Sequence, residues 1–221
     1  MCKVYGHTQE GTMRQDAREK RARLIDSHVK VRETFSFAHP EEQLMAAEKY
    51  CMSLYGSNLY DFNDKEFEMI CSAWRTGVKL AWGVHCGCRT FLLQQVLAPG
   101  VTSLRVNLLL RFRTFFRSLL NSPSPEVQVA VRLAARDLRS SIGSNLALLR
   151  KETGGLDPWA AGPGQLKRAL LQSEAKPVPT QDAWRVPLLR RLLEERLHHF
   201  YMGDKLQESR VQGLLDSLVV N

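Results

Sequence analysis

Apolar residues recur at helical spacing along most of this 221-residue chain, and no segment shows the sustained apolar–polar alternation of a β-strand. In the longest such stretch the apolar residues fall on one arc of a helical wheel: Val101, Leu104, Leu108, Phe112, Phe115 and Leu119. Such an arc must be buried against other helices when no sheet is available. We therefore predict an all-α fold, an irregular bundle of about nine helices with at most a short N-terminal strand at Lys3 to Tyr5.

Proline, acidic residues and capping residues predict where several helices begin. His39-Pro40-Glu41-Glu42 has proline at the first helical position and acids where the helix dipole favours them. Asn63 and Glu66 have the spacing of a capping box, and Ser124-Pro125-Glu126 predicts another start. The helix from Met13 to Phe35 is expected to turn three apolar side chains toward the bundle: Leu24, Ile25 and Val29.

Glycine and proline concentrate at residues 154–164 and 176–179, which is typical of loops or linkers. We expect a helical bundle over residues 1–153, followed by a linker and a C-terminal helical module over residues 154–221. In that module the periodicity predicts a short helix and a final hairpin: Gln165–Ser173, Asp182–Met202 and Lys205–Val219. The leucines of the hairpin need an apolar partner, so we expect it to dock on the bundle.

The net charge of +8 and the isoelectric point near 9.4 bear on partners, because a basic surface attracts phosphate backbones. No apolar run approaches the ~18–20 residues that a membrane span needs. The five cysteines are odd in number and unevenly spaced, unlike a secreted disulfide framework. The expected protein is intracellular, in nucleus or cytoplasm, with no membrane partner.

Catalytic signals are absent from the sequence. Two-metal polymerase chemistry needs paired carboxylates, and the chain has no Asp-Asp pair. The nearest acidic cluster is explained as loop and helix-start acids: Asp61, Asp64, Glu66 and Glu68. No glycine-rich phosphate loop or nucleophile elbow is present. We expect no enzyme activity and no cofactor.

His85, Cys86 and Cys88, with Cys71 one helix upstream, are the candidate metal ligands. Structural zinc sites usually space their cysteines more widely, because neighbours in sequence cannot easily face one tetrahedral centre. The expected reading is a cysteine-bearing turn without metal.

Three basic clusters could contact phosphates. On the first helix we select Arg14, Arg18, Arg21 and Lys30, and on the helix after Val101 we select Arg113 and Arg117. The third cluster is Arg132, Arg136 and Arg139. The alternative is a solvated basic face whose aliphatic stems cover apolar surface.

Three further side chains have structural expectations. Trp74 and Trp82 are predicted to be core anchors of their helix. Arg105 falls on the apolar arc, and if it is buried it needs an acidic partner.

The stretch from Met45 to Thr90 also carries a family resemblance. Its sequence, AAEKYCMSLYGSNLYDF…SAWRTGVKLAWGVHCGCRT, resembles the C-terminal part of the reverse transcriptase of LINE-type (non-LTR) retrotransposons. There a "YC…LYGS-LWD" helix precedes a "W+…" helix and a "+WG(L/V)P" turn. Val4-Tyr5-Gly6-His7 with Glu10-Gly11-Thr12-Met13 is similar to the hairpin that ends the palm, and Arg111 to Leu149 is similar to a downstream segment.

The resemblance implies a thumb-and-connector fragment without the catalytic palm. Such a fragment would bind an RNA or DNA template–primer duplex, or the element's RNA, through phosphates, and could work with a separate catalytic polypeptide. The alternative is a helical protein–protein interaction module, a domesticated or decaying retroelement fragment with no nucleic-acid role. Binding measured at two salt concentrations separates the two, because only phosphate binding weakens steeply with salt.

Overall fold

The structure, a computed structural model, describes residues 10–51, 60–63, 65–98, 101–175 and 177–220, with the backbone alone at 10–17, 50–51, 66 and 219–220. These residues form ten α-helices and no strand, which confirms the all-α prediction. The strand expected at Lys3 to Tyr5 lies outside them. The helices are α1 (Glu10–Thr34), α2 (Pro40–Ala46), α3 (Lys65–Ala81), α4 (Thr90–Val96), α5 (Leu104–Leu120), α6 (Pro125–Arg136), α7 (Ser141–Glu152), α8 (Pro163–Glu174), α9 (Arg185–Met202) and α10 (Lys205–Val220), with a π-helical turn η1 (Ala47–Cys51) and a 3-10 turn η3 (Thr180–Asp182).

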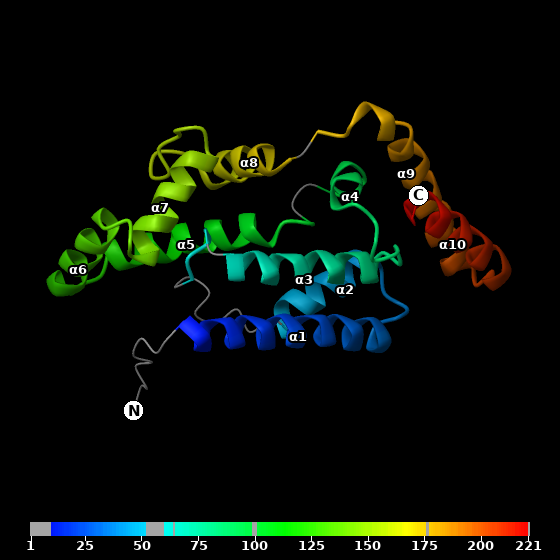
Figure 1. Ribbon diagram of the computed structural model, residues 1–221, viewed down its shortest axis with the longest axis horizontal. Helices are drawn as coiled ribbons and strands as arrows, with labels where there is room; N and C mark the ends of the chain where they lie inside the picture. The colour runs from blue at the N-terminus through cyan, green and yellow to red at the C-terminus, as the bar shows by residue number, and fades with distance from the viewer. Residues whose placement is uncertain (1–9, 52–59, 64, 99–100, 176, 221) are drawn as a thin grey trace.

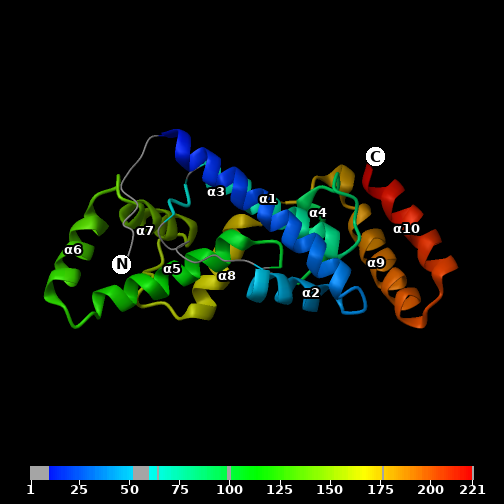
Figure 2. The ribbon, with the colours of Figure 1, turned by 90° about the horizontal axis from the view of Figure 1, so that it is seen from below.

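The helices form an elongated molecule with a central pair and two ends (Figures 1 and 2). In the centre α1 packs along α3, and α2 contacts both. From there α5 leads to α6 at one end, while α9 and α10 form the other end. No helix in the described ranges is long and apolar enough to cross a membrane.

The core is centred on α3. Trp74 and Trp82 are both buried, as predicted, and the indole Nε1 of Trp74 donates to the carbonyl of Val101 at 3.0 Å. Among the α1 side chains that the structure describes, from Arg18 onward, the buried ones are Leu24, His28 and Val31, which follow one another at helical spacing. Val29, expected toward the bundle, is instead exposed, because it lies more than a quarter turn from that row.

Two of the predicted helix starts have side-chain caps, whereas the capping box expected at Asn63 and Glu66 depends on the side chain of Glu66, which lies outside the described residues. His39 caps α2 in a capping box, where its Nδ1 accepts from the Glu41 N–H and the Glu42 carboxylate accepts from the His39 N–H. Ser124 caps α6 as predicted, accepting from the Val127 N–H at 3.3 Å. The apolar arc of α5 is interrupted at its start by Ser103, whose hydroxyl accepts from the Val106 N–H, so α5 begins at Leu104.

The C-terminal hairpin is present, with α9 packed on α10. Gly203 ends α9 in the left-handed region at φ 71°, where a glycine is favoured. The helix starts later than predicted because the chain first forms η3. That turn places the buried Asp182 3.2 Å from Arg89 and 3.3 Å from Arg185.

The hairpin is attached to the turn that ends α3. A guanidinium N–H of Arg196 donates to the carbonyl of Trp82, and the amide of Gln212 donates to the carbonyl of Gly83 at 2.8 Å. Gly83 has φ 59°, and a Cβ at this position would overlap the Arg196 guanidinium. The docking surface for α9 therefore depends on a residue without a side chain.

Candidate nucleic-acid interface

One side of α1 is buried and the other is open. Its buried row faces α3, so the cations on the remaining surface point to solvent. Arg18 and Arg21 are both exposed, and neither forms an ion pair with a described residue. These two guanidinium groups are therefore accessible to an external anion.

Arg14, Arg18 and Arg21 are spaced four and three residues apart, which is the spacing of a single row on a helix. The row covers about 10 Å of helix axis, the rise of about three successive phosphates of one duplex strand. The backbone of Arg14 belongs to α1, and its side chain lies outside the described residues.

Lys30 lies outside this row and is partly neutralised. Its ammonium is 2.8 Å from the carboxylate of Asp26, one turn earlier, and both side chains are largely exposed. An exposed pair of this kind contributes little to stability, so a phosphate can still compete with Asp26 for Lys30. Lys30 is a weaker member of the candidate interface than Arg18 or Arg21.

Arg113 is buried, contrary to its predicted role. Its guanidinium donates from Nε to the carbonyl of Pro158 and from Nη2 to the carbonyl of Ala161 at 3.0 Å. These bonds fix the chain between α7 and α8, inside the region predicted as a linker. Arg113 cannot reach a phosphate in this fold, and we remove it from the predicted interface.

Arg117 is exposed on the last turn of α5. However, α5 packs on α3, α6, α7 and α8, whereas α1 packs on α2, α3 and η1. The structure therefore does not combine Arg117 with the α1 row into one cluster, and Arg117 remains a separate candidate.

The acidic cluster has structural partners where it is described. Asp61 accepts from the Asn63 N–H and from the Ser144 hydroxyl, each at 2.9 Å. Glu68 pairs with Arg75 and lies 3.9 Å from Arg105, which provides the acidic partner expected for Arg105. The side chains of Asp64 and Glu66 lie outside the described residues.

Next to this cluster a buried amide holds the segment before α3. Asn145 is fully buried on α7, where its Oδ1 accepts from the Phe62 N–H at 2.9 Å and its Nδ2 donates to the Tyr60 carbonyl at 2.6 Å. Arg105 donates to the carbonyl of Phe62 at 2.9 Å. The polar groups of this segment are therefore used in joining α3, α5 and α7.

The candidate metal ligands are not gathered in one place. Among the described residues no group of three or more His, Cys, Asp or Glu side chains could hold a metal ion. Burial, with a smaller contribution from Glu68, raises the pKa of the Cys71 thiol to about 12. His85 and Cys86 are exposed, and the Nδ1 of His85 accepts from the Gly87 N–H at 3.0 Å. Cys88 is buried, with its Sγ 3.7 Å from the carbonyl of Arg89.

Sequence reasoning missed Arg196. It is a half-buried residue of α9 that lines a cavity together with Arg32 of α1. No local pattern marks the two as partners, because they come from helices far apart in the chain.

No protein-family model, no curated protein and no solved structure matches this chain.

Proposed function

We propose that this chain is a non-catalytic nucleic-acid-binding fragment, similar to the thumb and connector of a LINE-type reverse transcriptase, and that α1 contacts the phosphates of an RNA or DNA duplex. The observation that carries this proposal is the exposed pair Arg18 and Arg21 on a helix whose opposite face is fixed to α3. A rigid helix holds its cations at fixed spacing, which lowers the entropic cost of meeting a regular row of phosphates.

The expected mode of binding is electrostatic and independent of base sequence. Guanidinium groups bind phosphate oxygens with charge-assisted hydrogen bonds, and phosphate contacts position a protein without specifying sequence. The net charge of +8 adds long-range attraction to any polyanion. RNA and DNA duplexes are therefore expected to bind with similar affinity.

The test replaces Arg14, Arg18 and Arg21 together with Gln, which preserves helix propensity. Binding of a fluorescein-labelled DNA duplex and an RNA–DNA hybrid, each of about 20 base pairs, is measured by anisotropy between about 50 and 200 mM salt. The triple variant should bind both more weakly, and the slope of log affinity against log salt should fall by up to about three, one for each lost phosphate contact.

A matched control is available on α6 and the turn after it. Replacing Arg132, Arg136 and Arg139 with Gln removes the same charge from exposed positions on a different element. These residues are the third basic cluster, which the proposal does not assign to phosphate binding, so this control should retain the salt slope of the parent. If both triple variants lose affinity equally, only net charge matters, and if neither does, the assignment of α1 fails in favour of the interaction-module alternative.

A further inference from the structure

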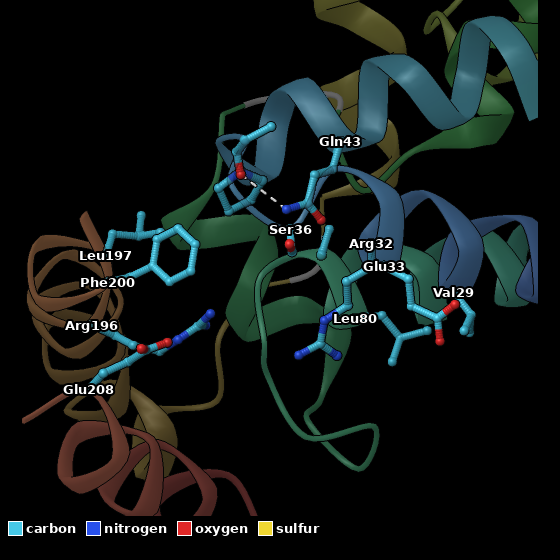
Figure 3. A pocket seen from close by; sticks show the side chains of 13 residues that line it. Val29, Arg32, Glu33, Ser36, Gln43, Leu80, Arg196, Leu197, Phe200 and Glu208 are labelled. Atoms are coloured by element: carbon cyan, nitrogen blue, oxygen red, sulfur yellow. Dashed lines mark hydrogen bonds between the residues drawn. The ribbon is translucent and has the colours of Figure 1, made fainter. Parts of the chain in front are cut away.

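A cavity of about 520 Å³ lies between the C-terminal half of α1, the start of α2, the end of α3 and the hairpin of α9 and α10 (Figure 3). Its walls are mainly apolar. The apolar lining comes from α1, α2, α3 and α9 (Val29, Pro40, Leu80, Leu197 and Phe200), and α10 contributes Glu208. Its size falls within the range of ligand pockets, which are typically lined by apolar side chains with a few polar groups.

Two arginines converge on this cavity from opposite walls. In Figure 3 the guanidinium groups of Arg32, from α1, and Arg196, from α9, extend toward one another. Burial lowers the pKa of Arg196, and the positive charge of Arg32 lowers it further. Arg32 forms no ion pair with a described residue. An anion between the two groups would relieve their repulsion.

Acidic groups offset the charge of Arg196 only in part, because Glu208 and Asp216 raise its pKa while burial and Arg32 lower it, and the pKa is lowered overall. The Glu208 carboxylate lies near Arg196 and raises its pKa, but it is also 3.4 Å from the ammonium of Lys205. Glu33 lines the cavity on the side of Val29, and Figure 3 shows its carboxylate turned away from Arg196. An anion placed between the two guanidinium groups would therefore meet a cation on either side.

Exposed apolar side chains lie close to the lining residues in the sequence, and one of them, Tyr201, is stacked on His39, beside the lining residue Pro40, with ring centroids 6.5 Å apart. Phe35 and Phe37 flank the lining residue Ser36, and Tyr201 and Met202 follow the lining residue Phe200. Phe37 is 73% and Met202 71% exposed. Aromatic, methionine and arginine side chains are enriched at protein interfaces. The rim therefore favours a protein segment over a small solute.

We propose that this cavity binds a segment of a partner protein in which a carboxylate side chain lies next to an aromatic or large aliphatic side chain. The apolar side chain inserts between Leu80, Leu197 and Phe200. The carboxylate bridges Arg32 and Arg196, and the rest of the segment lies on the exposed aromatic rim. The site is independent of the nucleic-acid proposal, because none of the residues assigned to phosphate binding lines it.

The experiment selects short random peptides against the full chain by surface display, and measures the anisotropy of the best peptide after fluorescent labelling. Selected peptides should carry Asp or Glu close to Phe, Trp, Leu or Met. Arg32→Gln should weaken binding by about tenfold or more, as expected for a lost charge-assisted hydrogen bond. Ser36→Trp, at an exposed lining position, should block the cavity and abolish binding.

Two controls separate this site from the rest of α1. Arg23→Gln removes a largely exposed cation that does not line the cavity, and it should leave peptide affinity unchanged. The α1 triple variant with Gln at positions 14, 18 and 21 should also bind the peptide normally. If that variant loses nucleic-acid binding but keeps peptide binding, the two sites are separate. The two proposals can therefore fail independently.

Several results would overturn the proposal. These are failure to select any peptide, selection of peptides without a carboxylate, or equal peptide affinity in the parent and Arg32→Gln. Binding of dodecanoate that Ser36→Trp blocks, without peptide binding, would assign the cavity to small amphiphiles instead. Self-association of the parent that Arg32→Gln abolishes would assign it to a second copy of the chain.

Discussion

The imidazole ring of His28 lies against Gly77, so closely that a Cβ atom on this glycine would overlap the ring. The same ring makes an edge contact with Trp74, with ring centroids 5.2 Å apart. His28 comes from α1 and the other two residues from α3, so this contact sets how closely the central pair of helices approach. The buried histidine therefore has little room to move.

Gly77→Ala is therefore expected to destabilise the protein although alanine is the better helix former. Overpacking a filled interior typically costs about 1–3 kcal/mol, which exceeds the propensity gain of about 1 kcal/mol. Urea unfolding followed by circular dichroism measures the difference. Gly213→Ala on α10 is the control, since nothing lies within 4 Å of a Cβ there, and this variant should be as stable as the parent or more so.

The free energy of unfolding should fall as the pH is lowered, because of His28. Burial lowers its pKa to about 4 from the ordinary value of 6.5, so between these pH values the unfolded chain binds a proton that the folded chain does not. Above pH 6.5 the free energy of unfolding is therefore unaffected by the titration of His28. It falls by about 3 kcal/mol in total as the pH is lowered to about 4. In His28→Leu, the dependence of unfolding free energy on pH should be flatter in this window, and an unchanged slope would contradict the assignment.

Asn145→Ala should be strongly destabilising. The change leaves the N–H of Phe62 and the carbonyl of Tyr60 without their partner, and each unsatisfied buried group costs about 1–3 kcal/mol. Asn63→Ala removes a nearby exposed amide that donates to the Ser144 hydroxyl, and should cost less. Thermal unfolding of the two variants compares them directly, and equal shifts would count against the buried role of Asn145.

Trp74→Ala should cost about 3–5 kcal/mol, the range seen for buried tryptophan. Trp74 is 3% exposed, and its truncation removes both its packing contacts and its hydrogen bond to the carbonyl of Val101. An unfolding midpoint unchanged within error would show that the indole is accessible, and would revive a base-stacking role for it.

Primer extension tests the catalytic expectation. The purified chain should not extend a primer on an RNA or DNA template with Mg²⁺ or Mn²⁺, because Asp61 and Glu68 are held by structural partners and the sequence has no Asp-Asp pair. Template-dependent extension that a chelator abolishes would show that an active site has been overlooked.

The sequence alone predicts those helix ends and buried residues that depend on neighbouring positions in the chain. Ser124 and Pro125 start α6 as predicted, and Gly203 ends α9 because its backbone lies in the left-handed region. The burial of Trp74 follows from its place in an apolar pattern. Each of these features depends on residues within a few positions of one another.

Features that depend on distant segments could not be predicted. Arg113 sits among residues that alternate between basic and aromatic, a pattern that is equally compatible with exposure. Its burial follows only when the carbonyls of Pro158 and Ala161 are brought against α5. Likewise, nothing local indicates that Arg196 reaches the end of α3, since this contact depends on how the hairpin docks.

The cavity exists only while the hairpin is attached at Trp82 and Gly83, because its walls come both from the central helices and from the hairpin. Arg196 is a wall of the cavity and also the donor that holds α9 to the turn after α3. A ligand in the cavity that contacts Arg196 would therefore also stabilise the attachment of the hairpin, by thermodynamic linkage. Consider a ligand that binds only when the hairpin is attached. At a concentration of about 100 times its dissociation constant, it would stabilise the attached hairpin by about 2.7 kcal/mol. Protection of the hairpin from limited proteolysis would then report on a ligand bound near α1.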